Sequence, residues 1–212
     1  MKSMSLCMSV SALALLVPAT AFAQVSAVGT SAFGAGSTLS TFSSQVNNGE
    51  VNGTTVDGIL YTYSLGNGQL VFDGGPGVTN NVDPLNIVSV GSNAGILTMT
   101  LPGLSRAFGY GFALLVSTNV PIGTTISLFN GVTPIGSLSY SGSPDPTFAG
   151  GFAGIQSVTG FNRVTVTFNS TAATAFALDN VRTMPVPEPT TWALFGLGLA
   201  AVAVRRRQLR KG

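Results

Sequence analysis

The chain has 212 residues, of which 45% are hydrophobic and 8% charged, with no histidine, one cysteine and a formal net charge of +2. Without an imidazole, Ser-His and Cys-His nucleophile pairs and histidine-based zinc sites are excluded. The composition therefore points away from the common hydrolase and metalloenzyme classes.

The first 23 residues carry the pattern of a secretory signal peptide. Lys2 precedes an apolar run from Leu6 to Val17, and Ala21 and Ala23 supply the small residues of a cleavage site. The run is too short to cross the ~30 Å hydrocarbon core of a membrane as a helix. We expect signal peptidase to cut after Ala23, so that the mature chain starts at Gln24. A buried N-terminal helix is the alternative.

The body of the protein, residues 24–184, is expected to be one domain without cross-links. The one cysteine of the chain, Cys7, lies in the signal peptide and is removed with it, so the body has no cysteine for a disulfide. The two lysines, Lys2 and Lys211, also lie outside the body, which excludes Schiff-base chemistry there. A body of roughly 160 residues is long enough to bury a core without disulfides.

The body has the composition of a β protein, with 24 glycines and few helix formers. Alternation of apolar and polar residues predicts half-buried strands. The apolar positions of these strands are Ile59, Tyr61, Tyr63 and Leu65, then Leu97, Met99 and Leu101, then Val164, Val166 and Phe168. The run 112–116 is apolar throughout and predicts a central strand covered on both faces. The aromatic residues between glycines in 108–112 are expected in the core.

Turn sequences separate these runs. The clearest unit is a hairpin in which 126–129 turns at Asn130-Gly131, and its loop ends either there or after Pro134. Eight to ten strands without a fixed repeat predict an all-β fold, an antiparallel two-sheet jelly-roll-like sandwich rather than a closed barrel or β-helix. The Gly- and Ser-rich segment 24–58 predicts an exposed arm or a first edge strand.

The acids of the body offer little for catalysis. They all lie beside turn residues, and the body has no Trp to stack a sugar ring, which argues against a two-carboxylate glycosidase. These acids are Glu50, Asp57, Asp73, Asp83, Asp145 and Asp179. We therefore expect no enzymatic activity.

Asp179 and Asn180 close the last expected strand, 175–181, and are the candidate metal ligands. Carboxylate and amide oxygens suit calcium when several of them converge, and Asp57 and Asp73 are the candidate partners. This strand is similar to the last strand of calcium-containing jelly-roll sugar-binding modules. The alternative is that both side chains hydrogen-bond a neighbouring turn.

The C-terminal segment, residues 185–212, follows a fixed order. First comes a linker, 185–191, which contains the motif Pro187, Glu188 and Pro189. An apolar helix is expected next, from Trp192 to Val204. A basic tail, 205–212, follows and begins with Arg205, Arg206 and Arg207. The helix would be about 20 Å long, a short transmembrane anchor. The basic tail places the body outside the cytoplasm.

This order of motif, short helix and basic cluster resembles the PEP-CTERM sorting signal of Gram-negative bacteria. In that class an intramembrane protease, exosortase, is thought to recognise the motif and release the protein from its helix. The resemblance implies signal peptidase and exosortase as processing partners. It also implies a transient inner-membrane intermediate and then a cell-surface or secreted form. An ordinary single-pass tail anchor is the alternative.

The charges of the body make nucleic acid an improbable partner. Its three arginines and six acids give a net charge of −3, which is too few positive charges to neutralise the run of phosphates along a nucleic acid. The resemblance implies a structural or adhesive component of the exopolysaccharide or biofilm matrix. A calcium-dependent carbohydrate-binding, lectin-like module is the alternative, and an ice-binding protein is a remote one.

Overall fold

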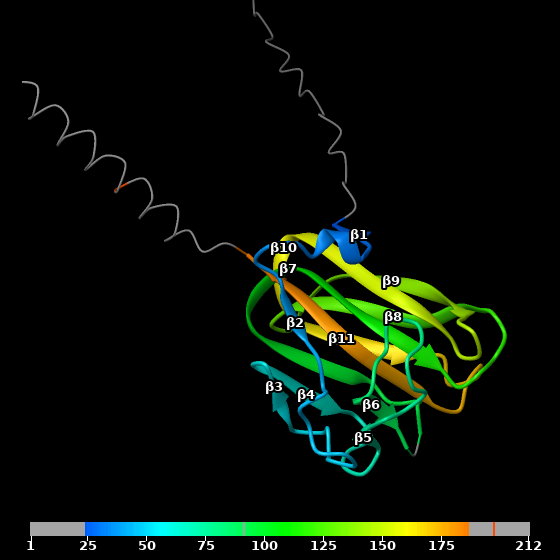
Figure 1. Cartoon of the computed structure of the whole chain (residues 1–212). Helices are drawn as coiled ribbons and strands as arrows, with labels where there is room; N and C mark the ends of the chain where they lie inside the picture. Colours follow the sequence, from blue (N-terminus) through cyan, green and yellow to red (C-terminus); the bar gives the residue numbers. More distant parts are fainter. Residues whose placement is uncertain (1–23, 91, 187–196, 198–212) are drawn as a thin grey trace, which may run out of the picture.

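The computed structural model describes residues 24–90, 92–186 and Leu197 and shows an all-β protein, as predicted (Figure 1). Besides a single 3-10 turn at Thr30–Ala32, the described part contains eleven strands, somewhat more than expected. They are β1 (Val25–Ala27), β2 (Thr38–Ser40), β3 (Thr55–Val56), β4 (Ile59–Tyr63), β5 (Leu70–Asp73), β6 (Asn86–Ser89), β7 (Leu97–Leu114), β8 (Val120–Asn130), β9 (Thr133–Pro144), β10 (Ala149–Phe168) and β11 (Phe176–Pro185).

Two long strands, β7 and β10, join the two layers of the sandwich. In their first pairing segment, β10 residues 149–156 pair with β7 residues 107–114, beside β11 and β6. In the second, β10 residues 163–166 pair with β7 residues 97–100, beside β4 and β8. The strands therefore form one continuous hydrogen-bonded network that folds into the predicted antiparallel two-layer arrangement.

The bends of these strands coincide in space. Register shifts interrupt the β7–β10 pairing between Gln156 and Arg163, opposite Pro102–Ser105 of β7. Bulges of this kind let a strand turn from one layer to the other. The sequence pattern predicted 97–101 and 112–116 as separate strands; the structure joins them in one strand, β7, with a bend between them.

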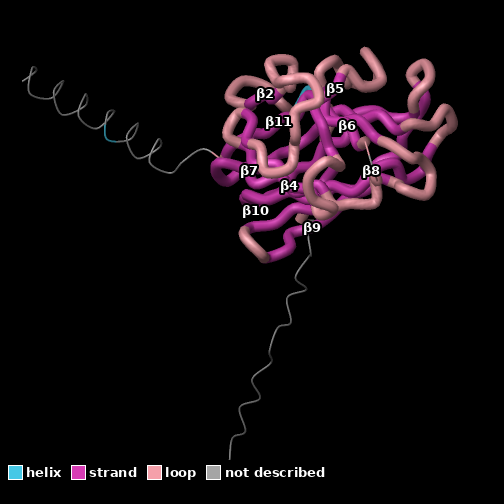
Figure 2. The backbone as a smooth tube through the Cα atoms, turned by 90° about the horizontal axis from the view of Figure 1, so that it is seen from below, coloured by secondary structure: helices cyan, strands magenta, loops and turns pink. Residues whose placement is uncertain are grey.

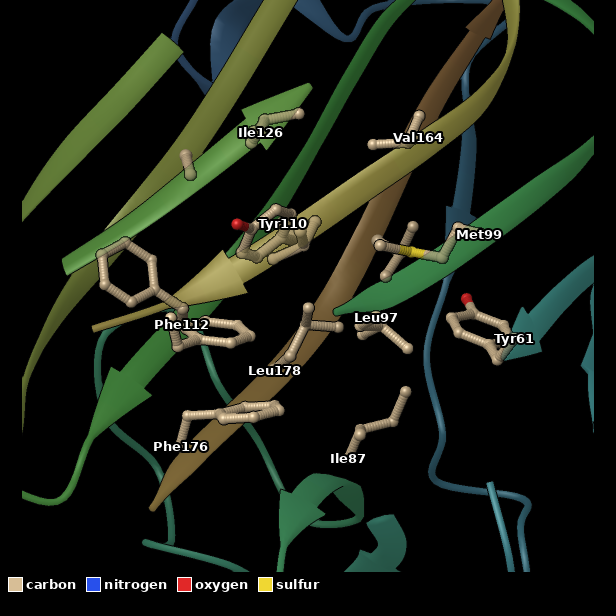
Figure 3. Close-up of a cluster of buried hydrophobic side chains, with 14 of the residues drawn as sticks. Tyr61, Ile87, Leu97, Met99, Tyr110, Phe112, Ile126, Val164, Phe176 and Leu178 are labelled. Atoms are coloured by element: carbon tan, nitrogen blue, oxygen red, sulfur yellow. The ribbon is translucent and has the colours of Figure 1, made fainter. Parts of the chain in front are cut away.

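The core lies between the two layers, where aromatic rings from both meet (Figure 3). Phe168 of one layer stacks on Phe176 of the other with ring centroids 3.8 Å apart and planes at 15°. Tyr110 and Phe112 are fully buried beside them, as expected for the 108–112 segment. Such aromatic pairs contribute about 0.5–1.5 kcal/mol each beyond the area they bury.

The period-two predictions hold for most positions. The apolar members of 97–101 and 164–168 are buried, and the threonines between them are partly or fully exposed. The predicted strand 59–65 ends at Tyr63, and Leu65 is exposed in the following loop. The run 112–116 was expected to be covered on both faces, but β7 ends at Leu114 and Leu115 is 54% exposed.

The predicted hairpin is formed by β8 and β9, and its loop ends early. Asn130 pairs with Thr133, which leaves Gly131 and Val132 as a two-residue connection. Gly131 has a φ of +59°, a conformation that glycine adopts at low cost at the first position of such turns. The strand then continues through Pro134, so the longer loop was wrong.

The segment 24–58 is more than an exposed arm. It contributes β1, β2 and β3, which pair with β10, β11 and β4 respectively. Phe42 and Val51 from its loops are completely buried in the core. Figure 2 shows the strands within the body and loops around β5 and β6.

The two ends of the chain are only partly covered by the structure. The expected signal segment 1–23 and the residues 187–196 and 198–212 lie outside the described residues. β11 reaches Pro185, one residue beyond the expected body boundary, and so the linker starts at Val186. The part of the chain that the structure describes contains no helix with the length and apolar character needed to cross a membrane.

Candidate functional site

A groove of about 280 Å³ lies on the outer side of the layer that contains β6, β11 and the second half of β7. Small side chains, Ala113 and Ala177, form its floor together with Val88. Phe148, from the connection between β9 and β10, stands beside them. Asp73 at the end of β5 is the one charged residue of the lining.

The connection between β5 and β6, residues 74–85, forms one side of this groove. Within it Thr79 and Val82 exchange backbone hydrogen bonds of 3.0 and 2.7 Å around Asn80-Asn81. Both asparagines have a positive φ, 52° and 61°, which is the pattern of a type I′ turn. Asn80 Nδ2 donates to the Phe148 carbonyl at 2.6 Å, so the turn holds the β9–β10 connection.

Gly111 of β7 lets this turn approach the sheet. A Cβ at position 111 would overlap the backbone carbonyl of Asn81. Phe112 and Tyr110 on either side face the core, which leaves the outer face at 111 free for the loop. The alternation of aromatic residues and glycine in 108–112 therefore serves both faces of the strand.

Asp179 and Asn180 lie in the middle of β11 and do not close it, contrary to the prediction. They sit at a register shift opposite Gly111, and Asn180 has a φ of +53°. Asp179 is 1% exposed, and its Oδ2 accepts the Asp83 backbone N–H at 3.0 Å. Asn180 Nδ2 donates to the Asn81 carbonyl at 2.8 Å and to Asp83 Oδ2 at 3.2 Å. Both side chains thus fasten the 74–85 connection onto β11.

The environment of Asp179 disfavours its ionised form. Burial raises the pKa of Asp179 from its ordinary value to about 6, while the hydrogen bond from the Asp83 backbone acts in the opposite direction. Its Oδ1 is buried and has no hydrogen-bond partner. A buried carboxylate oxygen in this state is a place where a proton or a cation is favourable.

The fit to calcium is partial. Asp83, rather than the expected Asp57 or Asp73, is the acid that shares hydrogen bonds with this pair. Calcium takes about six to eight oxygen ligands. Among residues 24–90, 92–186 and Leu197 there is no group of three or more His, Cys, Asp and Glu side chains that could hold a metal ion. A calcium ion here would need backbone and water oxygens as well.

The other predicted functional residues lie at the ends of the chain. Gln24, the expected first residue of the mature protein, is described and hydrogen-bonds the bend of β10. The remaining ones are outside the described residues: Ala21, Ala23, Pro187, Glu188, Pro189, Trp192, Val204, Arg205, Arg206 and Arg207. The last described residue before the motif, Val186, donates its N–H to the Leu104 carbonyl at 2.9 Å.

Comparison with known families identifies the C-terminal segment. The PEP-CTERM protein-sorting motif matches residues 185–207. The chain carries a PEP-CTERM sorting signal. This motif indicates export and exosortase-dependent sorting toward the cell envelope. No curated protein matches this PEP-CTERM chain.

Among solved structures, the PEP-CTERM chain is similar to family 29 carbohydrate binding modules. CBM29_1 from Piromyces equi has 9% identity and a TM-score of 0.39, over 69% of this chain and 89% of that chain. A tyrosine-to-alanine mutant of CBM29-2 has 12% identity and a TM-score of 0.40, over 69% and 90%.

Sequence reasoning missed the residues that build the groove. Phe148 follows a Ser- and Pro-rich turn sequence that predicts only a loop, and Ala113 lies within an apolar run. The Asn80-Asn81 pair carried a usable signal, because two consecutive asparagines are typical of a turn with positive φ. Nothing local to the sequence indicated that this turn rests on Gly111.

Proposed function

We propose that the protein is a non-enzymatic structural or adhesive component of the exopolysaccharide matrix, delivered by its PEP-CTERM signal and released by exosortase. The observation that carries this proposal is the position of the motif directly after the folded body. β11 ends at Pro185, and Val186 is still hydrogen-bonded to Leu104. Cleavage within Pro187 to Pro189 would therefore release every strand of the sandwich intact.

The chemistry of the body supports a binding or structural role over catalysis. Residues 24–184 have no His, Lys or Cys, so imidazole, amine and thiol groups are missing from the body as nucleophiles and bases. The most buried acid, Asp179, is engaged in holding a loop. A protein of this kind acts through its surface.

The test is the mass of the mature protein from culture medium and from membranes, in hosts with and without exosortase. We expect a secreted form that starts at Gln24 and ends between Pro187 and Thr190 only when exosortase is present. Glu188→Ala should keep the intact tail on the membrane, whereas the neighbouring control Thr191→Ala should be processed normally. Normal maturation of Glu188→Ala would contradict the proposal.

A second candidate is a calcium-dependent, lectin-like carbohydrate-binding module, which the groove favours. Its volume suits about one sugar unit, with Phe148 as an apolar wall and Asp73 as an acceptor for hydroxyl groups. The unpartnered Oδ1 of Asp179 supports a cation behind the groove loop. In this version calcium fixes the loop, and the loop shapes the groove.

Affinity electrophoresis of the protein in gels containing the host exopolysaccharide tests this candidate. Phe148→Ala should abolish retardation, and Phe129→Ala, an aromatic residue outside the groove, should not. Calcium should raise the thermal transition of the wild type but not of Asp179→Asn. Equal retardation of both phenylalanine variants, or a thermal transition that calcium leaves unchanged, would remove the basis for this candidate.

A further inference from the structure

The start and the end of the described body meet at one bend of β10. The Val158 N–H donates to the Gln24 carbonyl at 3.4 Å, and Gln24 Nε2 donates to Thr159 Oγ1 at 3.3 Å. A Cβ at Gly160 would lie 3.4 Å from the side chains of both Leu104 and Val186. Figure 1 shows β1 and the end of β11 near the same edge of the body. We call this edge the exit end.

The exit end is close to the C-terminal apolar run in sequence. Only residues 187–191 separate Val186 from Trp192. Because an extended chain spans at most about 3.6 Å per residue, the exit end can lie no more than about 20 Å from Trp192. If the apolar run is in the membrane, this end of the sandwich faces the bilayer surface.

Each of the three arginines of the body lies within three residues of the exit end in the chain, and Arg106 is the exposed one among them. Arg106 follows Leu104 by two residues, Arg163 follows Gly160 by three, and Arg182 precedes Pro185 by three. These are all the arginines of the body, which has no lysine. Asp57 is the one acid that lines the pocket beside Leu104 and Pro185, whereas Asp73 lines the groove at the other end. The charge separation gives the exit end an attraction for anionic surfaces.

Three connections at the exit end present exposed apolar side chains. Leu104 in the bend of β7 is 47% exposed, Val158 in the bend of β10 is 86% exposed, and Val132 in the β8–β9 turn is 85% exposed. The β8–β9 turn belongs to this end because the Gly131 N–H donates to Asn162 Oδ1 at 2.8 Å, two residues from Gly160. Apolar tips among arginines are a combination suited to the interface of an anionic bilayer.

We propose that the exit end is a membrane-contacting surface that binds anionic phospholipid headgroups while the protein is anchored. Arg106 and its neighbours provide the charge, and Val132 and Val158 enter the interfacial region. The contact holds Val186, the residue before the motif, close to the membrane surface, where an intramembrane protease works. The inference rests on the proposed function, since it requires the C-terminal run to be in the bilayer.

Depth-dependent fluorescence quenching tests the contact with the full chain. In a Cys7→Ser background, Val158→Cys and the matched exposed control Val78→Cys each carry one environment-sensitive fluorophore. Both proteins are reconstituted in phosphatidylcholine vesicles with and without phosphatidylglycerol, and quenching by headgroup-labelled lipid is measured. We expect Val158 to be quenched about threefold more than Val78 in the anionic vesicles, with the difference reduced by high salt and by Arg106→Gln.

The outcomes separate this inference from the proposed function. Protein that floats with the vesicles but shows equal quenching at 158 and 78 overturns the membrane-contacting surface alone. Protein that does not float with the vesicles overturns the membrane anchor of the proposed function and this inference with it. A quenching difference that is the same without phosphatidylglycerol overturns the role of the arginines.

Discussion

The connections at the exit end of the sandwich are open to solvent, whereas the long connection at the groove end packs against the sheet. At the exit end Gly103 has no atom within 4 Å of where its Cβ would be, and Val158 is almost fully exposed. At the groove end the 74–85 connection lies on the sheet, with the Asn81 carbonyl against Gly111 and the Asp83 N–H on Asp179. At the groove end a long loop is therefore held against the face of the sheet, as the wall of a binding surface requires.

The glycine pair 111 and 103 offers the largest effect and the most direct test of this contrast. Gly111→Ala forces either the Asn81 turn or β7 to move, because the overlapping atom is a backbone carbonyl. We expect a loss of about 3 kcal/mol in the free energy of unfolding, measured by urea denaturation. Gly103→Ala, in open space, should lose nothing measurable. Equal losses in the two variants would mean that the two ends do not differ in this way.

The second-largest effect concerns Asp179, whose contribution to the free energy of unfolding depends on pH. Its pKa in the folded protein is about 6, above the ordinary value of 3.8. The unfolded chain therefore ionises first, so the wild type loses stability as pH rises from about 4 to about 6 and stays at the lower level above that. Relative to Asp179→Asn, the free energy of unfolding should fall by about 2–3 kcal/mol between pH 4 and pH 7.

Urea denaturation of both proteins across this pH range measures the difference, in which the other titrating groups cancel. Any constant cost of the Asn side chain also drops out, because only the change with pH is compared. A difference that does not vary between pH 4 and pH 7 would show that Asp179 is not held in an unfavourable environment for its charge.

The sequence predicted the strands of the sandwich but not the contacts that hold the loop at its groove end. Strands such as 97–101 and 164–168 were found because alternation is a local signal of burial on one face. The contact of Asn81 with Gly111 and the hydrogen bond between Asp83 and Asp179 join residues far apart in the chain, for which no spacing rule exists. For the same reason the sequence suggested Asp57 and Asp73 as partners of Asp179 and did not indicate Asp83.

The sorting signal was predictable for another reason. Pro187, Glu188 and Pro189 act as a short linear motif beside an apolar run, so their meaning does not depend on the fold. The groove depends on the fold entirely: Ala113, Ala177 and Phe148 come from three separate segments. The sorting signal could therefore be predicted from the sequence, and the groove on the surface of the body could not.

The smallest expected change in the free energy of unfolding comes from the Asn80-Asn81 turn at the groove end. Asn81 has a φ of +61°, a conformation that asparagine tolerates and alanine disfavours. Since only the Asn81 backbone carbonyl is used by Asn180, Asn81→Ala should cost about 1 kcal/mol through conformation alone, and Asn81→Gly should restore that loss. Urea denaturation of the two variants measures both. If Asn81→Ala is as stable as wild type, the turn is not held in this conformation and the groove wall is as free as the loops at the exit end.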